Sequence, residues 1–72
     1  MFEVFFENGY GMRSFIGKAE TRKNIFPIIE QDLTTRAPHF KWYYTRSWTT
    51  NSGEIHYDVG SWSEFYIAVP IS

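Results

Sequence analysis

Only one stretch of this 72-residue chain has the periodicity of an amphipathic helix. Its apolar residues recur at i, i+3, i+4 and i+8, a spacing that puts side chains on one face of a helix. These residues are Ile25, Ile28, Ile29 and Leu33. The segments on either side follow the two-residue period of strands instead, so the sequence predicts one helix set against a sheet.

Proline and capping residues set the limits of this helix. Pro27 fits only in the first turn, where its missing N–H has no partner to lose. Asn24 as the N-cap meets that condition, and Thr21 is the rival N-cap, which would imply a kink at the proline. Ala37 precedes Pro38 and is pushed out of the α region, which ends the helix.

The segment before the helix reads as a hairpin. Residues 2–7 alternate as a half-buried strand does. Asn8-Gly9 follows, a pair typical of a type I′ turn because both central positions need positive φ. Residues 12–18 then form the returning strand, in which Gly17 marks a bulge or the end of the strand.

Three further strands follow the helix. Residues 40–49 have the strongest strand pattern in the chain, residues 54–59 alternate in the same way, and residues 64–69 form the last strand. Residues 51–53, Asn-Ser-Gly, are turn chemistry. The order β-β-α-β-β-β with short turns predicts a single α+β domain over residues 1–72. We expect a curved, mainly antiparallel five-stranded sheet with one helix packed on one face.

The aromatic residues exceed what this helix can cover. The chain has 7 Phe, 5 Tyr and 3 Trp, 21% of its residues. Five strands make a sheet about 20–24 Å wide, whereas one helix is about 10 Å across. Because aromatic residues fall on both faces of several strands, either the sheet curls strongly around its own core or part of it binds a partner.

Composition excludes several classes of protein. There is no Cys and there are only two His, which excludes disulfides and argues against a closed zinc site. The net charge of −1 gives no strong field toward nucleic acid or an anionic membrane. The first residues lack the basic region of a signal peptide, and no apolar run could span a bilayer. We expect a soluble cytoplasmic protein without metal or cofactor.

Charges of opposite sign fall in consecutive segments. Residues 33–53 contain no Asp or Glu but carry Arg36, Lys41 and Arg46, whereas residues 54–72 contain no Lys or Arg. The fold brings these two segments side by side. We therefore expect complementary ion pairs between neighbouring strands.

One polar triplet could carry chemistry. Glu54, His56 and Asp58 share one face of a strand, where a base and its orienting partner, or metal ligands, could converge. The alternative, which we prefer, is the solvated face of an antiparallel strand. The chain has no Gly-rich phosphate loop and no nucleophile elbow, so we expect no enzymatic activity and no catalytic residues.

Two segments of the C-terminal half carry a resemblance. Residues 43–48, Tyr-Tyr-Thr-Arg-Ser-Trp, and residues 57–65, Tyr-Asp-Val-Gly-Ser-Trp-Ser-Glu-Phe, resemble a pattern in small uncharacterised proteins of phages and mobile elements of Gram-positive bacteria. The resemblance implies a short phage accessory protein acting in the host cytoplasm, a class that includes inhibitors of host defence such as anti-CRISPR proteins. The second segment also predicts a turn in which Asp58 accepts backbone N–H groups and Trp62 caps the core.

These observations predict a non-enzymatic protein that binds a host or phage protein through an aromatic sheet face. They also predict that the protein can form a homodimer. The predicted partner-binding residues are Phe5, Tyr43, Arg46, Trp48, Trp62 and Tyr66. The alternative is single-stranded nucleic-acid binding through the basic and aromatic segment 41–48. Its predicted residues are Arg36, Lys41 and Arg46. No metal site and no contact with a membrane are expected.

Overall fold

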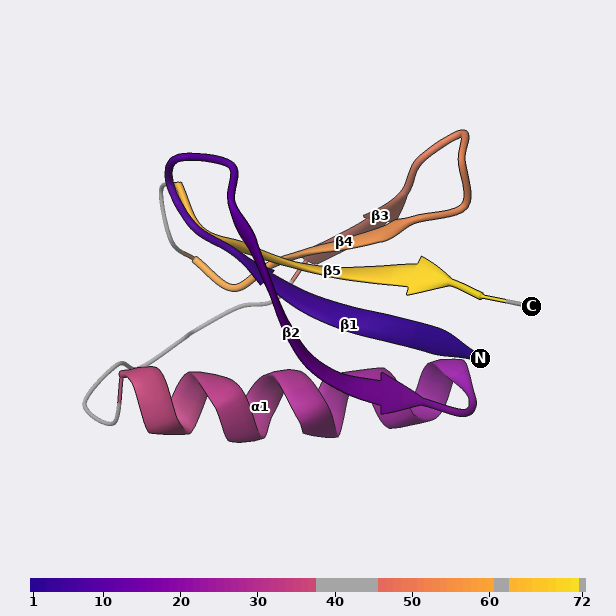
Figure 1. Ribbon diagram of the computed structural model, residues 1–72, viewed down its shortest axis with the longest axis horizontal. Helices are drawn as coiled ribbons and strands as arrows, with labels where there is room; N and C mark the ends of the chain where they lie inside the picture. The colour runs from indigo at the N-terminus through magenta and orange to yellow at the C-terminus, as the bar shows by residue number, and fades with distance from the viewer. Residues whose placement is uncertain (38–45, 61–62, 72) are drawn as a thin grey trace.

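The computed structural model describes residues 1–37, 46–60 and 63–71 and contains one five-stranded sheet and one helix (Figure 1). The elements in chain order are β1 (Phe2–Glu7), β2 (Arg13–Ala19), the 3-10 turn η1 (Arg22–Asn24), α1 (Ile25–Arg36), β3 (Arg46–Thr49), β4 (Ile55–Asp58) and β5 (Phe65–Pro70). The strand order in the sheet is β2-β1-β5-β4-β3, and every neighbouring pair is antiparallel. The predicted α+β fold is confirmed.

The helix begins and ends where proline allows. Thr21 precedes η1, and its hydroxyl lies 2.7 Å from Oδ1 of Asn24, which leads directly into α1. Pro27 therefore falls in the first turn of the α-helix, as expected. Ala37 has φ −140° and ψ 71°, outside the α region, so the predicted end before Pro38 is confirmed.

The first hairpin has a longer turn than the sequence predicted. Gly11 N donates to Asn8 O at 3.0 Å, Asn8 N donates to Met12 O at 2.9 Å, and Gly11 has a positive φ of 80°. A two-residue turn at Asn8-Gly9 was therefore wrong. The physical reason is the Asn8 side chain, whose Oδ1 accepts the N–H groups of Tyr10 and Met12 and closes a larger loop.

The second hairpin, between β3 and β4, repeats this turn. Gly53 N donates to Thr50 O at 3.0 Å, and Thr50 N donates to Glu54 O at 2.8 Å. Gly53 has a φ of 89°, which favours glycine at this position. Both hairpins thus turn through three residues that end in a left-handed glycine.

A bulge bends β2. Val4 pairs with Gly17 and Phe5 with Phe15, so Ile16 is an extra residue in β2. The bulge expected at Gly17 therefore lies beside it. A Cβ on Gly17 would come within 3.2 Å of Ile28 Cγ2, so the absence of a side chain lets α1 pack closely against β2 at this point.

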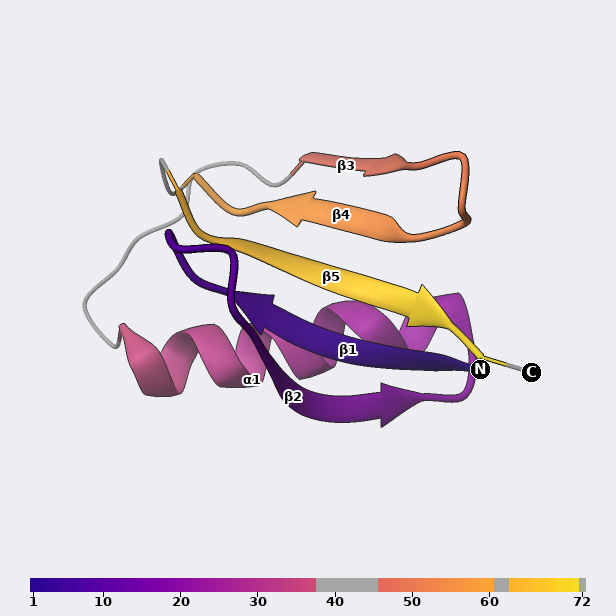
Figure 2. The same ribbon diagram turned by 45° about the horizontal axis from the view of Figure 1, so that its top comes forward.

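The helix packs on one face of the sheet, behind β1 and β2 (Figure 2). Buried residues on this side come from α1, from all strands except β3, and from the residue that follows β4. They are Val4, Ala19, Ile25, Ile29, Leu33, Ile55, Tyr57, Val59, Tyr66 and Ala68. The predicted helical stripe thus packs as expected, with Ile28 at its margin. The first part of the strand predicted at 40–49 lies outside the described residues, and residues 46–49 form β3 as predicted.

Candidate functional site: the open face of the sheet

The face of the sheet that points away from α1, here called the open face, collects the large exposed side chains of the strands. Alternation and register place on it one set of residues from each strand. These are Glu3, Phe5, Glu7, Arg13, Phe15, Lys18, Arg46, Trp48, Glu54, His56, Asp58, Phe65, Ile67 and Val69. No second layer of secondary structure covers this face in the described part of the chain (Figure 1).

The open face is curved. Both hairpin turns rise from the sheet on the side away from α1 (Figure 1). An ion pair spans the curve: Arg13 Nη2 on β2 lies 3.3 Å from Glu54 Oε1, just before β4. β1 and β5 lie between these two strands in the sheet, so a flat sheet would hold the two side chains too far apart.

Arg13 and Glu54 belong to a chain of four charged or titratable side chains. Arg13 Nε contacts Glu7 Oε1 at 3.1 Å, and His56 Nε2 lies 3.1 Å from Glu54 Oε1. The hydrogen bonds from Arg13, and then from His56, lower the pKa of Glu54 below its ordinary value. The hydrogen bond to Glu54 in turn raises the pKa of Arg13. These contacts link the first hairpin to β4 across the curved face.

Ile67 is fully buried on the open face, although α1 lies on the other side of the sheet. It is 0% exposed, and its cross-strand neighbours are Phe5 on β1 and His56 on β4. The open face therefore has a small core of its own. Sequence reasoning missed Ile67 because its alternation with Tyr66 shows only that the two residues point to opposite faces, and not which face closes.

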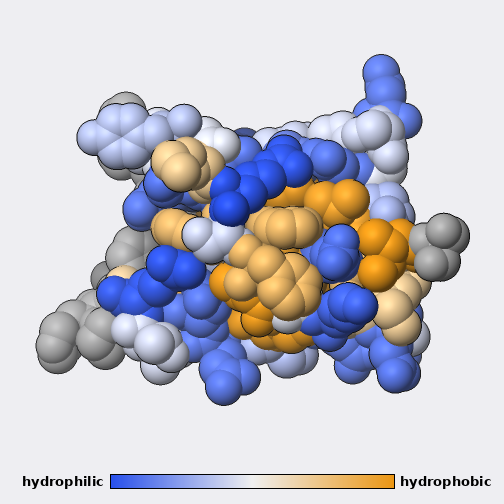
Figure 3. Space-filling view, viewed as in Figure 1, coloured by the Kyte–Doolittle hydropathy of each residue, from blue (hydrophilic) through white to orange (hydrophobic). Residues whose placement is uncertain are grey.

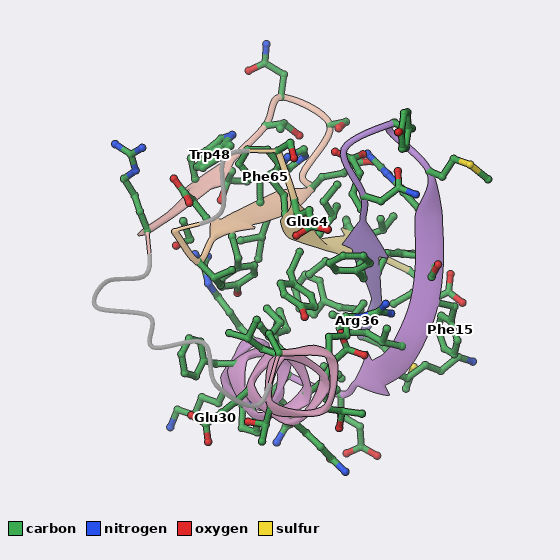
Figure 4. All side chains as sticks on the ribbon, turned by 90° about the vertical axis from the view of Figure 1, so that its left-hand side faces the viewer. Phe15, Glu30, Arg36, Trp48, Glu64 and Phe65 are labelled. Atoms are coloured by element: carbon green, nitrogen blue, oxygen red, sulfur yellow. The ribbon has the colours of Figure 1, made fainter. Side chains whose placement is uncertain are left out.

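Aromatic rings flank this small core on both sides. Phe5 and Phe15 meet edge to face with ring centroids 5.8 Å apart. The ring centroid of Trp48 lies 6.1 Å from that of Phe65 and 5.6 Å from that of His56. Phe15 and Trp48 stay 54% and 43% exposed, and lie toward opposite edges of the sheet (Figure 4). Apolar side chains also gather over the middle of the molecule, where β1 and β2 run, with hydrophilic residues around them (Figure 3).

The predicted partner-binding residues divide into three groups. Phe5, Arg46 and Trp48 lie on the open face. Tyr66 is only 1% exposed and faces α1, so its place in the partner-binding set was wrong. The reason is its alternation with Phe65, which takes the open side of β5. Tyr43 and Trp62 lie outside the described residues.

Tyr66 instead anchors a polar cluster under the sheet. Its hydroxyl donates to Asp32 Oδ2 at 2.7 Å, and the same oxygen contacts Arg36 Nε at 2.6 Å. Burial, followed by this hydrogen bond, raises the pKa of Tyr66. A cavity of about 330 Å³ borders Tyr66, Arg36 and Glu64 at the C-terminal end of α1.

The two described residues of the predicted nucleic-acid site do not share a surface. Arg36 lies on the α1 side, with its Cζ 3.9 Å from the centre of the Phe6 ring and its Nε on Asp32. Arg46 lies on the open face and contacts Asp58 Oδ2 at 3.2 Å. Lys41 is outside the described residues. Arg36 and Arg46 thus each already have a carboxylate partner.

The triplet of Glu54, His56 and Asp58 splits into two pairs. Glu54 and His56 contact each other, whereas Asp58 contacts Arg46 and accepts the N–H of Gly60 at 2.9 Å. The predicted ion pairing between neighbouring strands is therefore confirmed for Arg46 and Asp58, and so is the turn capped by Asp58. Within residues 1–37, 46–60 and 63–71, no three metal-ligating groups come together.

Comparison of the chain with protein-family models, curated proteins and solved structures found no match. None of the helices among the described residues has the length and apolar character needed to cross a membrane.

Proposed function

We propose that the chain is a non-enzymatic binding module whose open face docks on a partner protein. The observation that supports this most is that two exposed aromatic side chains, Phe15 and Trp48, lie on either side of the buried residue Ile67. Large aromatic side chains around a packed centre are typical of protein interfaces. Such a face exposes apolar area that no other described helix or strand covers.

The charges of the open face favour a protein over a nucleic acid. Its described side chains include three basic groups, Arg13, Lys18 and Arg46, and four carboxylates, Glu3, Glu7, Glu54 and Asp58. Two of the basic groups, Arg13 and Arg46, already contact carboxylates of the same face. A phosphate backbone would have to displace these pairs, so the balance of charge does not favour it.

We further propose that the partner is a host or phage protein and that the module inhibits it, in the manner of an anti-CRISPR protein in the host cytoplasm. This rests on the resemblance of residues 43–48 and 57–65 to small phage proteins, and on the small size of the chain. A module with only a binding face acts by occupying the surface of another protein.

A photo-crosslinking residue tests the face. Benzoylphenylalanine in place of Trp48 samples the open face, and the same probe in place of Glu30 samples the outer side of α1 (Figure 4). In lysate of the host, we expect one dominant adduct from position 48, removed by excess unlabelled protein, and none from position 30. Equal adducts from both positions would contradict the proposal.

Self-association is measured separately. Light scattering coupled to size-exclusion chromatography reports the molar mass at high micromolar concentration. A mass of twice 8.6 kDa, lost in a Trp48→Ala variant, would identify a second copy as the occupant of the open face. A monomeric mass leaves the open face to another protein.

The nucleic-acid alternative has its own test. It predicts a gel shift with single-stranded oligonucleotides at low salt that weakens when Arg46 and Lys41 are neutralised. The absence of a shift at low salt ends this alternative.

A further inference from the structure

The outer edge of β2 combines three features that the open face does not explain. β2 is the outer strand of the sheet and pairs only with β1, so no described strand pairs with its other edge. A groove runs beside that edge, between β2 and α1. Basic residues follow one another along β2 and into η1. We propose that this edge binds an acidic, extended segment of another protein as an added strand.

The groove results from the bulge in β2. At Gly17 the strand packs closely against Ile28, and beyond the bulge it rises away from α1 toward the first hairpin turn (Figure 1). The space left between them has a volume of about 270 Å³. Its lining residues are Ile16, Ile28, Gln31, Asp32 and Thr35. Ile16 of β2 and Ile28 of α1 form its apolar part, and the other three residues, all on α1, form its polar part.

The charge along this edge selects an acidic partner. From residue 13 to residue 23 the chain has four basic side chains and one acidic side chain, Glu20. The basic residues are Arg13, Lys18, Arg22 and Lys23, and all four are exposed. Arg13 already contacts two carboxylates, so Lys18 and the two residues of η1 carry most of the attraction.

The same charges argue against a second copy of this chain. In a two-fold antiparallel pair centred on the middle of β2, Arg13 of one copy would lie opposite or beside Lys18 of the other. Like charges in cross-strand positions are destabilising. The edge is therefore protected from self-pairing but open to a strand of opposite charge.

Alternation in an added strand assigns its side chains. One set would enter the groove against Ile16 and Ile28, where Asp32 disfavours acidic groups. The other set would lie on the open-face side of β2, beside Phe15 and Lys18. The bound segment is thus expected to alternate apolar and acidic residues. This inference concerns the edge of β2 and does not depend on what occupies the open face.

The test uses an acetylated peptide of ~9 residues that alternates valine and glutamate, about the length of a strand. In a titration followed by amide chemical shifts, we expect the signals of β2 and of the groove side of α1 to shift and those of β3 to stay unchanged. A peptide with lysine in place of glutamate should bind at least about tenfold more weakly. Shifts confined to Trp48 and β3, or equal binding of the lysine peptide, would overturn the proposal.

Backbone methylation separates strand addition from simple charge attraction. In an added strand, alternate N–H groups point to β2 and the others point away. Of two peptides N-methylated at alternate positions, one should keep its affinity and the other should lose it by about tenfold or more. Equal affinity of the two peptides would rule out strand addition.

Two threonines on α1 provide a matched pair of variants. Thr34 and Thr35 are both exposed and both hydrogen-bond to the carbonyl four residues earlier, but only Thr35 lines the groove. Thr35→Trp should fill the groove and weaken the peptide about tenfold, whereas Thr34→Trp should not. Equal effects would overturn the proposal. So would a single-stranded oligonucleotide that binds β2 as tightly as the peptide, or concentration-dependent shifts of β2 without peptide.

Discussion

On the side of α1, apolar side chains of the helix and of the strands pack into the main core. On the open face no described helix packs, and the curved sheet buries a smaller centre. Ile29 of α1 and Ile67 of β5 are both 0% exposed, yet only Ile29 lies on the side of the sheet where the helix packs. Ile67 instead lies between Phe5 of β1 and His56 of β4, on the face that the ion pair of Arg13 with Glu54 spans. A small domain can thus bury residues on both faces of a sheet with one helix.

The difference also concerns where polar groups lie. Under the sheet, Tyr66, Asp32 and Arg36 form one cluster at the edge of the apolar core. Over the sheet, charged groups lie across the face itself and hold its two sides together. The open face therefore keeps exposed aromatic rings beside paired charges, a composition suited to an interface.

The largest expected effect breaks the comparison directly. Ile67→Ala should cost about 2–5 kcal/mol of unfolding free energy, the same range as Ile29→Ala, because both side chains are fully buried. Urea denaturation of the two variants measures this. A cost below about 1 kcal/mol for Ile67→Ala would show that the open face has no core of its own.

Tyr66→Phe tests the polar cluster under the sheet. It keeps the ring but removes the hydrogen bond to Asp32, for an expected loss of about 1 kcal/mol. Because the folded state raises the pKa of Tyr66, its contribution is complete below the ordinary tyrosine value of 10.0 and is lost as the pH rises above it.

The variant should therefore lose less stability than the parent between neutral pH and the alkaline range above pH 10.0. Tyr57, whose pKa burial also raises, contributes to both proteins and cancels in the difference. Identical alkaline profiles for parent and variant would contradict the assignment.

Glu54→Gln tests the ion pair that spans the open face. At neutral pH we expect a loss of about 0.5–1 kcal/mol, because the pair is partly exposed. The folded state lowers the pKa of Glu54, so its contribution is complete above the ordinary value of 4.5 and disappears as the pH falls through the folded value. The two proteins should converge in stability in acid, and a constant difference down to low pH would count against the pair.

The last variant sharpens the functional side of the comparison. Trp48 is 43% exposed on β3, whose four residues are all exposed, so Trp48→Ser should cost about 1 kcal/mol of unfolding free energy, well below the cost of Ile67→Ala. Under the proposed function it should nevertheless abolish capture of a partner protein from lysate of the host. A matched variant on the outer side of α1, Glu30→Ser, should leave both properties unchanged. A Trp48→Ser variant that captures the partner normally would remove this ring from the interface.

Local patterns in the sequence predicted the elements well. Alternation located the strands to within about one residue at most ends, and the helical stripe with Pro27 and Pro38 located α1. The Asn8-Gly9 turn failed because the Asn8 side chain closes a longer loop, which depends on geometry over five residues rather than on the pair alone. Tyr66 was placed on the wrong side because alternation separates two faces without saying which one α1 covers.

What the sequence alone determined, then, is each short-range feature: the single helix, the strands, the places where the chain turns between them and the surplus of aromatic residues. Only the tertiary structure decided the strand order β2-β1-β5-β4-β3, the pair of Arg13 with Glu54, and the burial of Ile67. Arg13 and Glu54 are 41 residues apart, and their contact depends on how far the sheet curves. Periodicity reports on neighbours along the chain, whereas the open face is assembled from five strands that meet only when the whole sheet has formed.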